Sequence, residues 1–126
     1  MYSHDYNSNY HPPMPVVEIW VSSLENPGEG VALTALVDSG SDTTFIPITH
    51  LQTLKAERVR KARVRGIRGG SYSVDMYMVK IVIGPYELFG VRAVGDKQGE
   101  VILGRNVLNE LIVTLNGLAH EVVLSR

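Results

Sequence analysis

The sequence predicts one all-β domain, and two observations support this prediction. From Val16 onward, short runs rich in β-branched residues are separated by clusters of Gly, Pro, Asn and Asp, a pattern typical of strands joined by tight turns. The length of 126 residues suits a single domain with one hydrophobic core. A content of 44% hydrophobic and 20% charged residues is ordinary for such a domain.

Each run between turn signals is expected to form one strand. The expected strands are 16–21, 31–37, 44–47, 58–65, 72–83, 86–94, 101–103, 112–115 and 119–124. Asn116-Gly117 predicts a hairpin turn between the last two, since Asn-Gly is the strongest short hairpin signal. A helical turn is expected over 49–56, and one short C-terminal helix over 107–112, from their apolar spacing.

The first 15 residues differ in composition from the rest. They are polar, rich in Tyr, Asn and Ser, and end in His11-Pro-Pro-Met-Pro15. Because prolines lack the backbone N–H, we expect a flexible N-terminal arm at 1–15, followed by a domain over 16–126. His4 and His11 raise the question of a metal site, but no acidic or thiol partner has ligand spacing, so a solvated tail is favoured and no metal or cofactor is expected.

Composition also excludes several classes of function. A net charge of −1 argues against a nucleic-acid or membrane partner, and the absence of cysteine excludes thiol catalysis and disulfides. No apolar run reaches the ~20 residues that span a bilayer, and no signal-peptide pattern begins the chain, so a cytoplasmic protein is expected. The basic run Arg58–Arg65 has two readings, a nucleic-acid patch or one solvated strand face. The second is favoured because no stacking aromatics are interleaved.

The most informative segment is Asp38-Ser39-Gly40, which directly follows the apolar run 31–37. An acidic residue at the end of a buried strand needs a reason to be there, since burial of a charge is costly unless it is paired.

Three segments in order resemble the retropepsin-like, single-lobe aspartic peptidase family. The first is Asp38-Ser39-Gly40, and the second is the glycine-rich hairpin tip 66–70, which is similar to the flap of that family. The third is the run 101–108, Val-Ile-Leu-Gly-Arg-Asn-Val-Leu, which looks like its late apolar-Gly-Arg-Asn segment. The resemblance covers nearly all of 16–126. It implies a retropepsin-like acid-protease β-barrel that acts as a homodimer, with the active site on the two-fold axis.

The resemblance implies general acid/base hydrolysis of a peptide bond. Two Asp38 carboxyl groups held close together share one proton, a behaviour for which aspartic proteases are the standard case. The ionised carboxylate takes a proton from a water, and the other carboxyl group protonates the substrate carbonyl oxygen. The sequence has five aspartates, and only Asp38 lies in an Asp-Ser/Thr-Gly context, so the second must come from another chain. Strand 119–124 and the residues after Pro15 are the candidate interface segments.

Residues around Asp38 have expected supporting roles. Gly40 allows a sharp turn, and the Ser39 hydroxyl is expected to bond across the two loops. The Ser41 hydroxyl is expected to bond the Asp38 carboxylate, which favours its charged form and an acid-shifted activity optimum. Asp42 and Arg105 are expected to form an ion pair that braces the loops, and Asp42 to meet the substrate main chain.

Substrate contacts are expected from the flap residues Gly66, Ile67, Arg68, Gly69 and Gly70, and from Val101, Ile102 and Leu36. Arg68 departs from the small residue expected at the tip; a preference for acidic substrates and a solvent-facing side chain are equally open. His50 and His120 lack a Ser or Cys partner and are expected to have packing or surface roles. An alternative function is a dimeric peptide-binding module of the same fold with little or no turnover, since fold alone does not establish activity. A plain β-domain that binds a small ligand leaves the Asp38 and Arg105 motifs unexplained.

Overall fold

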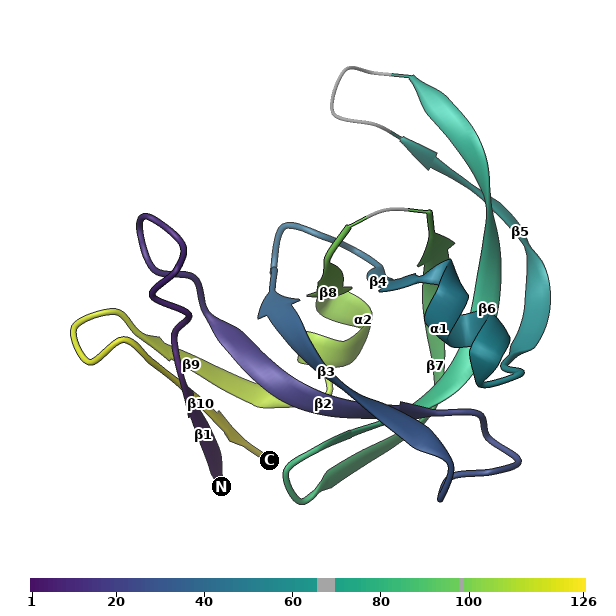
Figure 1. Ribbon diagram of the computed structural model, residues 1–126. Helices are drawn as coiled ribbons and strands as arrows, with labels where there is room; N and C mark the ends of the chain where they lie inside the picture. The colour runs from purple at the N-terminus through teal and green to yellow at the C-terminus, as the bar shows by residue number, and fades with distance from the viewer. Residues whose placement is uncertain (66–69, 98) are drawn as a thin grey trace.

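The structure is a computed structural model that describes residues 1–65, 70–97 and 99–126. The described residues form ten strands in two sheets and two short helices (Figure 1), which confirms the all-β prediction. The fold contains one helix more than the single C-terminal helix expected for the fold class, because the turn predicted over 49–56 is an α-helix, α1 (Ile48–Thr53).

A seven-stranded sheet forms the body of the molecule, with strand order β2-β3-β8-β4-β7-β6-β5. Its strands are β2 (Val16–Ser22), β3 (Gly30–Val37), β4 (Thr44–Pro47), β5 (Glu57–Arg65), β6 (Ser71–Ile83), β7 (Tyr86–Asp96) and β8 (Val101–Leu103). A further antiparallel pairing of β2 with β6, over Trp20–Ser22 and Lys80–Val82, closes this sheet into a barrel. The strand bounds lie within two residues of those expected from the sequence.

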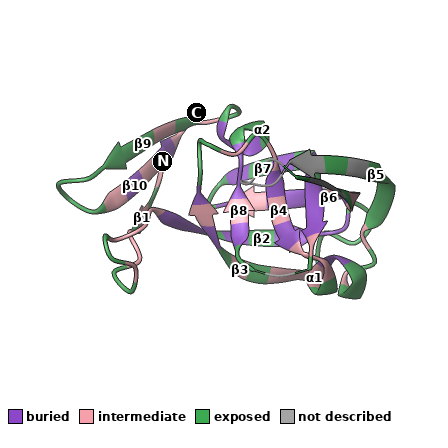
Figure 2. Ribbon diagram, turned by 90° about the horizontal axis from the view of Figure 1, so that it is seen from above, coloured by how far each residue is buried: buried purple, intermediate pink, exposed green. Residues whose placement is uncertain are grey.

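The barrel interior is apolar, as the alternation of β-branched residues predicts. Val17, Ile46, Val79 and Leu103 are fully buried there, and Leu51 of α1 joins them from one end. Figure 2 shows the buried positions concentrated on the central strands of the barrel. Burial of this side-chain set is the main stabilising contribution to the fold.

Two parallel pairings bring the functionally interesting strand ends together. β3 runs parallel to β8, and β4 runs parallel to β7, although the chain is otherwise antiparallel. The carboxyl ends of β3 and β8 therefore lie side by side, with Val37 opposite Leu103. The segments 38–43 and 104–106, which follow these two ends, emerge at the same place.

A second, three-stranded sheet contains both chain termini, in the order β1-β10-β9. Its strands are β1 (Tyr2–Asp5), β9 (Ile112–Asn116) and β10 (Glu121–Ser125), and it lies beside the barrel (Figure 1). The hairpin turn expected at Asn116-Gly117 is confirmed. The expectation of an arm without regular hydrogen bonds is wrong for residues 2–5, which pair with β10 from Tyr2 opposite Leu124 to Asp5 opposite Glu121.

The second helix, α2 (Arg105–Leu108), begins two residues before the position expected from its apolar spacing. Its buried residues are Val107 and Leu108, but its first turn starts at the extended Gly104, where the carbonyl accepts hydrogen bonds from the N–H groups of both residues. Among the described residues, no helix has the length and apolar character needed to cross a bilayer.

Candidate active site

Asp38 stands at the first position after β3, in the loop that leads to β4. Its backbone N–H donates to the carbonyl oxygen of Leu103 at 3.1 Å, which extends the parallel pairing of β3 with β8 by one residue. Its carboxylate Oδ1 accepts a hydrogen bond of 2.9 Å from the backbone N–H of Gly40. The side chain is exposed in the single chain, so the burial expected for this acid is not provided by the chain itself.

The backbone of Gly40 lies close to that carboxylate. A Cβ atom at this position would lie 3.1 Å from Asp38 Oδ1, closer than most real Cβ contacts. The turn is completed by the N–H of Ser41, which donates to the Asp38 carbonyl at 3.2 Å. Gly40 thus holds the side chain of Asp38 and Ser41 its main chain, which orients the carboxyl group before any substrate arrives.

The segment after β8 supports the Asp38 loop through hydrogen bonds and a close backbone contact. The Arg105 N–H donates to the Ser41 carbonyl at 2.8 Å, and the Arg105 guanidinium donates to the Ser39 carbonyl at 2.7 Å. Gly104 passes so close to Thr43 that a Cβ atom would lie 2.3 Å from the Thr43 carbonyl oxygen. Any other residue at 104 would push the two segments apart.

A buried hydroxyl links the same two segments, and sequence reasoning did not find it. Thr44 Oγ1 accepts from the Gly104 N–H at 3.2 Å and donates to Asn106 Oδ1 at 2.8 Å. Asn106 Nδ2 in turn donates to the carbonyl of Arg92 on β7 at 2.8 Å. The adjacency of Thr44 to the Asp38 loop and of Asn106 to Arg105 was the only available signal.

The hydroxyl of Ser41 does not bond Asp38. It donates to the carbonyl of Thr43 at 2.6 Å, so the expectation that it stabilises the charged carboxylate is wrong, and the acid-shifted optimum loses its physical basis. Ser39 is exposed, and within residues 1–65, 70–97 and 99–126 its hydroxyl has no hydrogen-bond partner. That free hydroxyl is compatible with a bond to a second copy of the loop.

Asp42 and Arg105 do not form the expected ion pair within the described part of the chain. The Arg105 guanidinium bonds the Ser39 carbonyl, while the exposed Asp42 carboxylate accepts from the Thr43 hydroxyl at 3.1 Å. Arg105 therefore supports the loop through a main-chain oxygen and leaves Asp42 available to other partners.

The expected substrate contacts divide into described and undescribed positions. Ile102 is half-buried and lies between Leu36 on β3 and Phe45 on β4, its partners in register, whereas Val101 is almost fully buried. Flap positions 66–69 lie outside the described residues, and Gly70 is exposed. In Figure 1 the hairpin of β5 and β6 extends beyond the barrel on the side of the loop that carries Asp38.

A contact between the N-terminal residues and the loop before β8 was also missed. The Tyr10 hydroxyl donates to the carboxylate of Glu100 at 2.7 Å, and this contact holds the pKa of Tyr10 above its ordinary value of 10.0. Both residues border a cavity of about 290 Å³ together with Leu36 and Val101. No local sequence signal indicates a contact between residues 90 positions apart.

Two further observations concern the histidine and acidic side chains outside the Asp38 loop. In residues 1–65, 70–97 and 99–126 there is no group of three or more His, Asp or Glu side chains placed to hold a metal ion. The ring of His120 stacks on Tyr6 with centroids 5.7 Å apart, which is a packing role.

Three solved protease structures have a similar fold. A retropepsin-like aspartic protease from Rickettsia conorii matches with a TM-score of 0.70 and 14% identity, covering 98% of this chain and 88% of that one. The EIAV protease complexed with the inhibitor HBY-793 matches with a TM-score of 0.59 and 24% identity, covering 77% of this chain and 86% of that one. The Simian Foamy Virus (mac) protease matches with a TM-score of 0.56 and 16% identity, covering 75% of this chain and 92% of that one. The fold is therefore retropepsin-like.

The family follows from the sequence itself. The family model described as "Aspartyl protease" matches residues 26–107, which include Asp38, strands β5 and β6, and Arg105. The chain belongs to this aspartyl protease family. A comparison with the sequences of curated proteins finds no match.

Proposed function

We propose that this protein is an aspartic endopeptidase that acts as a two-fold homodimer, with one Asp38 from each chain. The proposal rests on the hydrogen bonding and solvent exposure of the Asp38 carboxylate. Its Oδ1 is held by the Gly40 N–H, while its other oxygen has no hydrogen bond within the described residues and the side chain is open to solvent. A carboxyl group that is oriented by a hydrogen bond and still open to solvent is what a shared, water-activating pair requires of each partner.

The remaining aspartates of the chain do not offer a second catalytic carboxyl group. Asp5 lies on β1, Asp75 pairs with Arg58 at 3.7 Å, and Asp96 ends β7. Asp42 follows the Asp38 turn but bonds the Thr43 hydroxyl. These placements support a second Asp38 as the partner.

The terminal sheet supports a route to the dimer. Within the described residues β9 pairs only with β10, so its other edge is unpaired, and it carries Ile112 and Leu115 at 59% and 50% exposure. Leu118 in the adjoining turn is fully exposed. Apolar side chains along an unpaired edge favour association with another strand. The residues after Pro15 are less suitable, because β2 is already paired with β3 and β6.

In the proposed reaction, a water lies between the two Asp38 carboxyl groups, which together hold one proton. The ionised carboxylate removes a proton from the water as its oxygen attacks the peptide carbonyl carbon. The protonated carboxyl group donates its proton to the carbonyl oxygen, which gives a tetrahedral diol. Collapse of the diol, with proton transfer to the amine, breaks the C–N bond. The substrate would bind as an extended strand beneath the two flap hairpins.

Cleavage of a peptide library tests this proposal. Wild-type protein should cleave a subset of peptides, and Asp38→Asn should lose cleavage by at least about a thousandfold while it remains folded and dimeric. Glu25→Gln makes the same chemical change in the exposed turn between β2 and β3 and should leave the rate unchanged. A confirmed dimer that binds peptides without cleaving any of them would contradict the enzyme and favour a binding module.

A further inference from the structure

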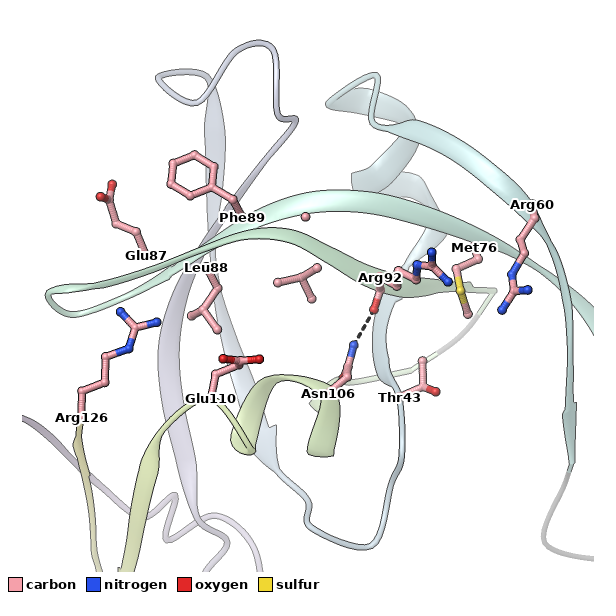
Figure 3. Close-up of a pocket in the computed structure, with 12 residues that line it drawn as sticks. Thr43, Arg60, Met76, Glu87, Leu88, Phe89, Arg92, Asn106, Glu110 and Arg126 are labelled. Carbon is pink, nitrogen blue, oxygen red and sulfur yellow. Dashed lines mark hydrogen bonds between the residues drawn. The ribbon is translucent and has the colours of Figure 1, made fainter.

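A cavity of about 550 Å³ begins at the Asp38 loop and extends along the outside of the barrel. We call the inner part of this cavity the arginine pocket (Figure 3). It is lined by Thr43, Arg60, Met76, Arg92 and Asn106. Thr43 donates to Asp42, and Asn106 follows Arg105, so the pocket shares its wall with the loop that presents Asp38.

The strand register explains why two arginines from different strands line one pocket. Arg60 of β5 lies opposite Met76 of β6, and Arg92 of β7 lies opposite Met78 of β6. Residues opposite each other in antiparallel strands share a sheet face, as do positions two apart along one strand. Arg60, Met76, Met78 and Arg92 therefore share one face. In Figure 3 the Arg60 and Arg92 side chains come toward Met76 from opposite sides.

Both guanidinium groups are without an acidic partner in residues 1–65, 70–97 and 99–126. This distinguishes Arg60 from Arg58 on the same strand, which pairs with Asp75. Of the two glutamates that border the same cavity, Glu87 is bound by Lys80 at 2.9 Å, and its side chain points away in Figure 3. Glu110 lies toward the outer end with Arg126. The inner part is therefore cationic, with an apolar wall formed by Met76.

The backbone that carries Arg92 is held in place. The Arg92 carbonyl accepts from Asn106 Nδ2, and Asn106 Oδ1 accepts from Thr44, whose hydroxyl also bonds Gly104 beside the Asp38 loop. One continuous set of hydrogen bonds thus fixes the Arg92 backbone relative to the loop that presents Asp38. Because its backbone is already held, Arg92 has only its side chain left to order when a ligand binds, which lowers the entropic cost of binding.

We propose that the arginine pocket binds an acidic side chain of the peptide substrate, at a position remote from the cleaved bond, and that Arg60 and Arg92 determine this preference. The proposal rests on the proposed endopeptidase function. The guanidinium groups would donate charge-assisted hydrogen bonds to the carboxylate, and the Met76 wall would contact its methylene groups. In a two-fold dimer the pocket occurs twice, so acidic residues are favoured on both sides of the cleaved bond.

The test compares peptides that carry Glu or Gln at each position of a cleavable sequence. Wild-type protein should cleave the Glu peptide about tenfold faster, in kcat/KM, at one position on each side of the cleaved bond. Arg60→Gln and Arg92→Gln should each lower this Glu-to-Gln ratio of kcat/KM, and the double variant should bring the ratio close to one. The ratio should also decline with added salt. Arg58→Gln, on the same strand but bordering a different cavity, should retain it.

Binding measurements separate this inference from the catalytic proposal. Peptide affinity is measured with Asp38→Asn protein, which binds without turnover. A tighter affinity for Glu peptides that depends on Arg60 and Arg92 would support the pocket even if wild-type protein cleaves nothing. Equal cleavage and equal binding of Glu and Gln peptides at every position would overturn the proposed role of the pocket but not the proposed endopeptidase activity. No binding and no cleavage of any peptide would overturn both.

Discussion

At the scale of single residues, Gly104 sets how closely the segment after β8 approaches the Asp38 loop. The Gly104 N–H bonds Thr44, and its Cα faces the Thr43 backbone with no room for a side chain. This contact, with the two hydrogen bonds from Arg105, holds the loop that presents Asp38.

We expect Gly104→Ala to lower the free energy of unfolding by about 3 kcal/mol or more, because a Cβ 2.3 Å from the Thr43 carbonyl oxygen forces two backbones apart. Urea denaturation measures the change. Gly28→Ala is the matched control, since a Cβ there meets no atom within 4 Å, and it should change stability by no more than about 0.5 kcal/mol. Equal effects of the two substitutions would refute the close-approach argument.

Ser41→Ala tests the corrected role of Ser41. The variant should lose about 1 kcal/mol of stability, because the Thr43 carbonyl loses its donor, and the pH profile of peptide cleavage should keep its shape. Denaturation and a pH series on the same preparation measure both quantities. A shifted pH profile with unchanged stability would instead place the hydroxyl on the Asp38 carboxylate.

The sequence predicts which residues matter near Asp38 better than it predicts their partners. Asp38, Gly40 and Arg105 can be predicted from the sequence because each belongs to a short local motif. The partner of Ser41 depends on the direction of its side chain, which no local pattern specifies. The partners of Arg105 and Thr44 depend on the packing of segments some 60 residues apart. Hence the loop-supporting position of Arg105 was anticipated, but not the main-chain oxygen that it bonds.

At the scale of elements, alternation of apolar residues predicts the barrel strands well, since each has one face in the core. β1 was missed because its four residues, Tyr2–Asp5, are short and mostly polar, and its partner β10 lies at the opposite end of the chain. α2 was placed two residues late because its first turn is defined by the Gly104 carbonyl rather than by an apolar residue.

Leu115→Lys tests β9 as the interface element. A charge on this exposed strand should raise the dimer dissociation constant at least about tenfold, because it would be desolvated in the dimer. Sedimentation at several concentrations measures the constant, and the protein concentration needed for half-maximal specific activity should rise in parallel. Leu24→Lys, in the turn between β2 and β3, should leave both unchanged. An unchanged dimer dissociation constant in Leu115→Lys would show that β9 is not the interface element.

At the scale of the whole molecule, one chain supplies half of the proposed catalytic site. Within the described residues, the barrel presents one exposed Asp38, one free Ser39 hydroxyl and the paired strands β5 and β6, and the terminal sheet beside it has an unpaired edge. The membership of the aspartyl protease family and the retropepsin-like fold agree with this arrangement. The proposal of a shared site can be made from the sequence alone, because a count of aspartates in the right context needs no coordinates.

The most direct measurement mixes wild-type and Asp38→Asn chains, lets the subunits exchange, and follows cleavage at constant total protein. If each site needs one Asp38 from each chain, activity should fall as the square of the wild-type fraction, to about a quarter at equal amounts. A linear fall, to about half, would show that each chain works alone and would contradict the shared site.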